Sequence, residues 1–147
     1  MNKKAIHGKT IFKSNLATDI RVAHECGFTG IEIVDSKLYS FLEQGYTTDD
    51  LNKILDKYQV VPVCINDICH VETDDAHQLD EILKATDYLS KAAQEINCPT
   101  IQLVPLLALE GRPWEEIVQI TGQNVGKIGA IGKQFGIRFQ MEPVAWS

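Results

Sequence analysis

The sequence predicts an α/β protein in which short strands alternate with longer helices around a parallel sheet. Two periodicities alternate along the chain: runs of β-branched and apolar residues, then segments with apolar side chains at helical spacing. The strand–helix unit recurs at roughly 30 residues, the length of a βαβ unit. No linker, low-complexity tract or change of composition divides residues 1–147, so we expect a single domain.

Three strands are predicted in the first half of the chain. A strand over residues 4–10 precedes an amphipathic helix, and Gly27 suits the left-handed residue that ends this helix. A second strand covers residues 30–34. The next helix begins at residues 47–50, where hydroxyl and carboxylate groups satisfy its free N–H groups, and it leads to a strand over residues 60–66.

Two further strand–helix units are predicted in the second half. A long helix over about residues 75–96 carries a continuous apolar stripe and leads to a strand over residues 100–104. Pro113 fits the first turn of a helix that runs to about residue 134. A fifth strand covers residues 136–142, and no helix follows it. The pattern thus predicts about five strands and four helices.

Strands joined by helical connections are parallel, and the connections are right-handed. Such a series forms either an open doubly wound sheet or a closed barrel. Neither arrangement is complete with this number of units, because the fifth strand lacks a following helix to cover it. The residue pattern alone leaves both open.

The composition restricts the classes of function. A net charge of −6 and a pI near 5.1 argue against nucleic acid as a partner, because phosphate-backbone contacts need clustered Lys and Arg. No apolar run approaches the roughly 20 residues that span a bilayer, and residues 1–8 lack the apolar core of a signal peptide. We therefore expect a cytoplasmic protein that does not enter membranes.

The four cysteines, at positions 26, 64, 69 and 98, could in principle form two disulfides. In a reducing compartment, and with a core of adequate size, free buried thiols are the expectation. Cys64, Cys69 and His70 superficially resemble a zinc cluster. The two cysteines are five positions apart, on opposite faces of a continuing strand, so we expect no shared metal there.

Polar side chains share one face of the predicted strands, and Glu142 is the last of them. It follows Arg138 and Gln140 on the face opposite to the apolar residues, at the carboxyl end of the fifth strand. At that end, a carboxylate can bind a divalent metal or move a proton next to a carbonyl. A salt bridge with Arg138 is the structural alternative. Glu32 lies lower in its strand, where a structural pair is favoured over substrate binding.

Two other residues are candidates for substrate binding. His70 follows the third strand at its carboxyl end and could reach the same edge as Glu142, or it could be a hydrogen-bonded loop residue. Trp146 lies just past Glu142, where an aromatic ring could pack against a sugar. His7, in the first strand, has a weaker claim.

Three glycines, Gly126, Gly129 and Gly132, recur at three-residue spacing. A phosphate-binding glycine loop must follow a strand and open a helix, whereas these fall inside a helix. We therefore expect them to permit close packing rather than to bind phosphate.

Two segments resemble a known superfamily. Residues 23–33 (AHECGFTGIEI) are similar to the helix-one to strand-two segment of xylose-isomerase-like barrels, and residues 140–147 (QMEPVAWS) to its strand-five segment. The superfamily comprises sugar and sugar-phosphate isomerases and epimerases, inosose dehydratases and endonuclease IV. The resemblance implies a parallel (β/α) barrel of the TIM type, here partial and restricted to the N-terminal half.

The resemblance also implies a metal site. Metal-dependent sugar enzymes of this kind hold Mn, Mg, Co or Zn with a Glu after strand five, an Asp after strand six, a His after strand seven and a Glu after strand eight. Glu142 matches the first ligand, and the other three have no counterpart in these residues. In the epimerases the two glutamates are also the acid–base pair. Since a complete barrel needs about 250 residues, we expect the isolated chain to be inactive.

Three functions therefore compete. The first is the N-terminal part of a divalent-metal-dependent sugar or sugar-phosphate isomerase or epimerase. The second is a non-catalytic half-barrel that self-associates or binds a partner through its exposed sheet edges. The third is an endonuclease-IV-like repair enzyme, which the acidic composition disfavours.

Overall fold

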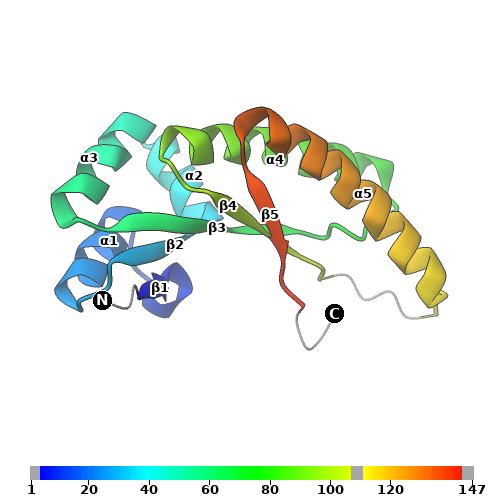
Figure 1. Ribbon diagram of the computed structural model, residues 1–147, viewed down its shortest axis with the longest axis horizontal. Helices are drawn as coiled ribbons and strands as arrows, with labels where there is room; N and C mark the ends of the chain where they lie inside the picture. Colours follow the sequence, from blue (N-terminus) through cyan, green and yellow to red (C-terminus); the bar gives the residue numbers. More distant parts are fainter. Residues whose placement is uncertain (1–3, 107–110, 144–147) are drawn as a thin grey trace.

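The computed structural model describes residues 4–106 and 111–143, which form one five-stranded parallel sheet (Figure 1). The strands pair in chain order, each parallel to its neighbours; they are β1 (Ala5–His7), β2 (Gly30–Val34), β3 (Val61–Cys69), β4 (Thr100–Val104) and β5 (Arg138–Met141). A doubly wound sheet reverses its strand order at a switch point, whereas a barrel adds each strand to the same side. The sequential order therefore makes this sheet a partial barrel.

The helices connect and cover the strands. They are the 3₁₀ helix η1 (Gly8–Ile11), α1 (Leu16–Glu25), α2 (Asp35–Glu43), α3 (Thr48–Tyr58), α4 (Ala76–Glu95) and α5 (Trp114–Phe135). Figure 1 shows α4 and α5 running together along one side of the sheet, with the carboxyl end of β5 projecting away from them. In the described part of the chain, no helix is long and apolar enough to cross a membrane.

The core lies between the helices and the outer face of the sheet. On the strands it is built from Ile31, Ile33, Ile65, Ile101 and Leu103, all at most 1% exposed. Leu16, Ile20, Leu51, Leu89 and Ile128 pack against them from the helices. Each such side chain stabilises the fold by about 1.5–3 kcal/mol through its removal from water.

Local signals set several element boundaries, and the helix start predicted at residues 47–50 is confirmed. Thr47 and Asp50 form a capping box at the start of α3, in which each side chain accepts a hydrogen bond from the other residue's backbone N–H. Asn15 caps α1 through a bond from the Thr18 N–H. Gly136 ends α5 at φ 72°, the left-handed conformation that favours glycine.

The prediction of four helices is wrong, because α2 is an additional helix. It starts at Asp35, directly after the last residue of β2, so no turn residues separate strand from helix. Only Leu38 and Phe41 are buried along it, which leaves a very short apolar stripe. Helix prediction from apolar periodicity needs several turns of helix, so it does not detect so short an element.

Three strands differ from the prediction in their bounds, and one of them is β5, which covers Arg138–Met141 rather than residues 136–142. The first strand stops at His7 rather than residue 10, because the His7 ring accepts a hydrogen bond from the Lys9 N–H and the chain turns into η1. Gly8 permits this turn: a Cβ there would lie 3.0 Å from both the Glu32 carbonyl oxygen and Val34 Cγ2. β3 is longer than predicted and continues to Cys69.

Candidate functional site

One polar side chain from each strand lies on the inner face of the sheet. His7 pairs in register with Glu32, Glu32 with Cys64, and Gln102 with Gln140. The Cys64 Sγ lies 3.9 Å from Gln102 Oε1, which joins the two groups across β3 and β4. We call these five residues the polar layer. On β2 and β4 their neighbours Ile31, Ile33, Ile101 and Leu103 point the other way into the core, as alternation requires.

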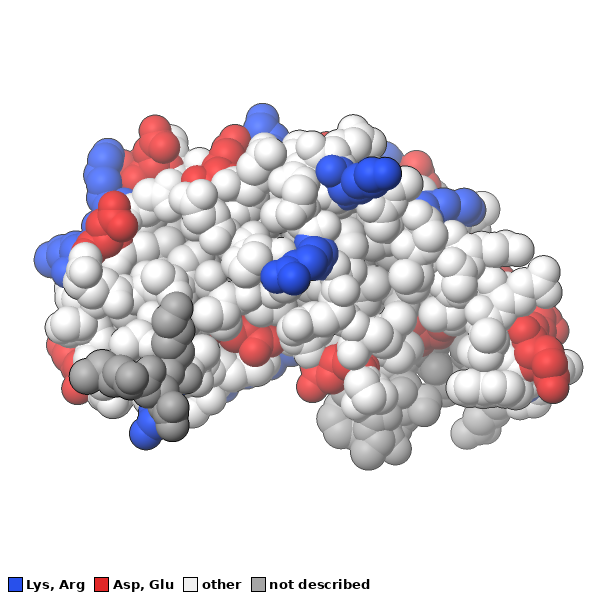
Figure 2. Space-filling view, in the orientation of Figure 1, with Lys and Arg blue, Asp and Glu red and all other residues white. Residues whose placement is uncertain are grey.

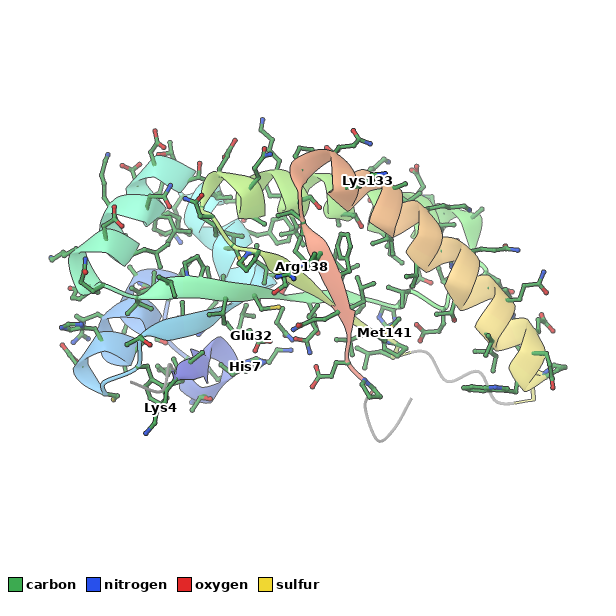
Figure 3. All side chains as sticks on the ribbon, in the orientation of Figure 1. Lys4, His7, Glu32, Lys133, Arg138 and Met141 are labelled. Carbon is green, nitrogen blue, oxygen red and sulfur yellow. The ribbon has the colours of Figure 1, made fainter. Side chains whose placement is uncertain are left out.

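His7 and Glu32 form the β1–β2 end of the polar layer, and Figure 3 shows them beside each other. His7 Nε2 lies 3.6 Å from Glu32 Oε1. His7 Nδ1 accepts a hydrogen bond of 2.9 Å from the Lys9 N–H, so in the neutral ring the proton is on Nε2, toward Glu32. Glu32 Oε1 makes no hydrogen bond among the described residues, so its contact with His7 is an ion pair only when the ring is protonated.

Cys64, Gln140 and Gln102 form the rest of the layer as a directed chain of hydrogen bonds. Gln140 Nε2 donates to Cys64 Sγ at 3.4 Å and to Gln102 Oε1 at 3.3 Å. Since Gln102 Oε1 accepts, its Nε2 is free to donate, and it donates to Glu142 Oε2. The chain therefore ends on the carboxylate predicted to be catalytic.

Glu142 lies one position past the end of β5. Its backbone N–H donates to the Leu103 carbonyl at 2.9 Å, which ties this end of the chain to β4. The residue is exposed, and of its two carboxylate oxygens only Oε2 has a hydrogen-bond partner among the described residues. No ion pair joins it to Arg138 in that part of the chain, so the structural alternative does not occur there.

His70 lies at the same carboxyl edge, after β3. Its backbone has φ 60°, and its N–H donates to the Val104 carbonyl at 3.1 Å. Cys69 pairs in register with Val104, and Glu142 bonds to Leu103, so β4 separates His70 from Glu142. Among the described residues, the buried His70 Nδ1 has no hydrogen-bond partner. Trp146 lies outside the described residues.

A second group of charged side chains lies where β2 and β3 end: Asp35, Asp67 and Lys9. Lys9 Nζ lies 3.5 Å from Asp67 Oδ2. Burial, with a smaller contribution from the charge of Asp67, raises the pKa of Asp35. Burial also raises the pKa of Cys69 to about 12, and Asp67 adds to this rise. Cys69 is therefore a protonated thiol at neutral pH and a poor metal ligand.

The other thiols are also free, and two are buried as expected. Burial raises the pKa of Cys64 to about 11 and that of Cys98 to about 12. The prediction of buried thiols is wrong for Cys26, which is exposed in the turn after α1. Across residues 4–106 and 111–143, no group of three or more His, Cys, Asp or Glu side chains could hold a metal ion.

Gln140 was predicted on the polar face without a role, and Gln102 likewise alternates with apolar residues in its strand. Their alternation with apolar residues was the available signal. The sequence does not show the register between the two strands. Gln102 reaches Glu142 because β4 and β5 pair with Leu103 opposite Met141, which neither strand indicates by itself. Acidic and basic side chains are interspersed over the face shown in Figure 2, without a continuous basic patch.

Comparison with solved structures supports the fold. Over 95% of this chain and 51% of the other, it matches the IolI protein, solved with a bound zinc atom, at TM-score 0.87 and 20% identity. D-psicose 3-epimerase from Clostridium cellulolyticum H10 matches at TM-score 0.75 and 12% identity, over 94% of this chain and 51% of that one. The probable 3-DHS dehydratase AsbF from Bacillus anthracis matches at 0.79 and 14%, over 95% and 52%.

At 20% identity or below, these matches show the fold alone. The chain folds like part of the TIM barrels it matches, and it spans about half the length of those structures. No protein-family model and no curated protein sequence matches it.

Proposed function

We propose that this chain is the N-terminal part of a divalent-metal-dependent isomerase or epimerase of sugars or sugar phosphates. The observation that carries the proposal is the geometry of Glu142. One carboxylate oxygen is held by Gln102, and the other has no hydrogen-bond partner among the described residues, at the edge where barrel enzymes carry their active sites.

The donor set fits a metal in part. Glu142 is a carboxylate ligand of the type that Mn²⁺, Mg²⁺, Co²⁺ or Zn²⁺ accept, and no described residues complete a cluster with it. When bound, such an ion would polarise the carbonyl of the substrate. The remaining ligands would come from the strands of a complete barrel.

Glu142 itself would move the proton. Its unbonded oxygen would take the proton from the carbon beside the carbonyl and could return it on the same face to a neighbouring position, as in an isomerase. In an epimerase, a second acid–base group from the strands of a complete barrel would deliver the proton to the opposite face. Gln102 would hold the second oxygen so that the first stays oriented. His70, Glu32 and Trp146 would bind the hydroxyl groups or ring of the substrate. A cytoplasmic location is part of the proposal, since sugars and their phosphates are intermediates there.

Exchange of substrate protons with solvent tests this proposal directly. In D₂O, a full-length protein that contains this chain and a complete barrel should incorporate deuterium next to the carbonyl of a ketose, and EDTA should abolish the exchange. Replacing the base, as in Glu142→Gln, should lower the exchange rate by about 10²–10⁴-fold. Glu115→Gln, an exposed change on α5, is the matched control. Equal rates in the two variants would refute the role of Glu142.

A second candidate is a half-barrel that self-associates. It is supported by the uncovered edge of β5, where Arg138 and Gln140 are exposed and Met141 is 43% exposed. Sedimentation of the 147-residue chain tests it: a monomer at all concentrations would refute it.

A further inference from the structure

A cavity of about 540 Å³ lies between η1, the start of α1, α2 and α3. It shares no residue with the polar layer and does not include Glu142 or His70. Its volume falls within the roughly 300–1,000 Å³ typical of small-molecule sites. The cavity is therefore large enough for a ligand of its own.

The lining of this cavity has the opposite charge to the protein. Three lysines, Lys9, Lys13 and Lys37, line it and no acidic residue does, although the chain has 20 Asp and Glu against 14 Lys and Arg. A concentration of one sign of charge in a hollow attracts a ligand of the other sign. The lining therefore favours an anion.

Only two of these lysines are available to a ligand. Lys37 Nζ donates to Asp19 Oδ2 at 2.6 Å, to the Gly8 carbonyl at 3.1 Å and to the Ile11 carbonyl at 2.9 Å, which uses all its protons. Lys13 is exposed and makes no ion pair within the described ranges. Lys9 is 48% exposed in its side chain; its Nζ lies 3.5 Å from Asp67 Oδ2, and its charge also acts on Asp35.

The start of α1 adds to the positive potential. Asn15, Leu16 and Ala17 line the cavity. Asn15 Oδ1 accepts from the Thr18 N–H, which leaves the earlier N–H groups of the helix unbonded by this cap. The positive end of a helix stabilises a nearby anion. The positive potential of this helix end therefore adds to the charges of Lys13 and Lys9, and all of them favour an anion.

The remaining walls are aromatic and apolar. Phe12 is 76% exposed and Tyr46 is 52% exposed, both at the cavity. Tyr46 stacks on the buried ring of Phe41, with centroids 4.8 Å apart. Leu16, Val34 and Ile54 complete the apolar lining. Exposed aromatic rings at a hollow are typical of a surface that an apolar ligand covers.

We propose that this cavity binds a small organic anion that combines a carboxylate or phosphate group with an aromatic or apolar body. The ammonium groups of Lys13 and Lys9 bind the anionic group, and the Phe12 and Tyr46 rings pack against the body. The proposal concerns a site separate from the polar layer and does not depend on catalysis by Glu142.

Phenyl phosphate is a suitable probe, with inorganic phosphate as the anion without a ring and benzyl alcohol as the ring without a charge. In ¹H–¹⁵N spectra of the 147-residue chain, phenyl phosphate should give saturable shifts of the amides at residues 12–17 and 36–46. Inorganic phosphate and benzyl alcohol should bind at least about tenfold more weakly, because each makes only one class of contact.

Charge and ring can be removed separately. Lys13→Glu should weaken phenyl phosphate binding by about tenfold or more, while Lys133→Glu, the same charge change on α5, should leave it unchanged. Phe12→Ala should weaken phenyl phosphate but not inorganic phosphate. Phe12 and Lys13 are exposed, so both variants should keep the wild-type spectrum elsewhere.

Three results would overturn the proposal. The first is the absence of saturable shifts with phenyl phosphate at millimolar concentration. The second is equal affinity for phenyl phosphate and inorganic phosphate, which would show that the cavity recognises only the anionic group and not the ring. The third is an equal loss of affinity in Lys13→Glu and Lys133→Glu, which would place binding elsewhere or make it non-specific.

Discussion

The two ends of the sheet differ in how the chain covers them. At the β1 end, η1 folds back over the strand. Lys37 of α2 stabilises η1 by donating hydrogen bonds to its Gly8 and Ile11 carbonyls. At the β5 end, none of the described residues, which reach position 143, folds back over the strand, and Arg138, Gln140, Met141 and Glu142 are exposed there. A ligand can reach the polar side chains of the sheet only where no connecting segment of the chain lies over them. The covered end is therefore built for stability, and the open end leaves a carboxylate accessible.

The largest effect should come from breaking the buried attachment at the covered end. Lys37 is 11% and Asp19 1% exposed in their side chains, and Ser14 also donates to Asp19. Lys37→Met should lower the free energy of unfolding by about 3–5 kcal/mol, because the Asp19 charge stays buried without its partner. Urea denaturation measures this.

Lys53→Met is the matched control for that change. Lys53 pairs with Asp50 at 2.9 Å but is 75% exposed, and exposed pairs contribute only about 0–1 kcal/mol. If both variants lose the same stability, η1 is not held by a buried ion pair and the contrast between the ends fails.

The open end depends on a close approach of α5 to β5. A Cβ on Gly132 would lie 2.7 Å from Phe139 Cζ and 3.3 Å from the Ile137 carbonyl, whereas at Gly129 nothing lies within 4 Å. Gly132→Ala should therefore destabilise by about 1–3 kcal/mol through overpacking. Gly129→Ala should stabilise by up to about 1 kcal/mol, since alanine is the better helix former. Thermal midpoints that move in the same direction would contradict the packing.

The smallest effect concerns pH and the thiol between the two ends. Burial raises the pKa of Cys98 from 9.0 to about 12. Above pH 9 the unfolded chain releases this proton while the folded chain keeps it, so stability should fall as the pH rises from 9 toward 12. In Cys98→Ala, urea midpoints between pH 8 and 10.5 should fall less steeply than in the wild type. An identical slope would show that Cys98 does not contribute.

Local sequence patterns were sufficient to predict most of the helices and strands, because caps and turns depend on neighbouring residues. Neighbouring residues signal the cap at residues 47–50 and the left-handed Gly27, and the structure confirms both. Gly136 was predicted to begin the fifth strand, but it ends α5 instead. The three glycines show the limit of such patterns. Close packing is confirmed at Gly132, but Gly126 and Gly129 have open space around them, because only Gly132 lies opposite Phe139.

The sequence by itself determined that this chain forms a parallel sheet of strand–helix units with one polar and one apolar face, because alternation along a strand and periodicity along a helix are properties of adjacent residues. Only the tertiary structure decided that Gln102 holds Glu142, that His7 lies next to Glu32, and that η1, α1, α2 and α3 together line a cavity with three lysines. The first two contacts join residues 40 and 25 positions apart, and their geometry depends on strand register.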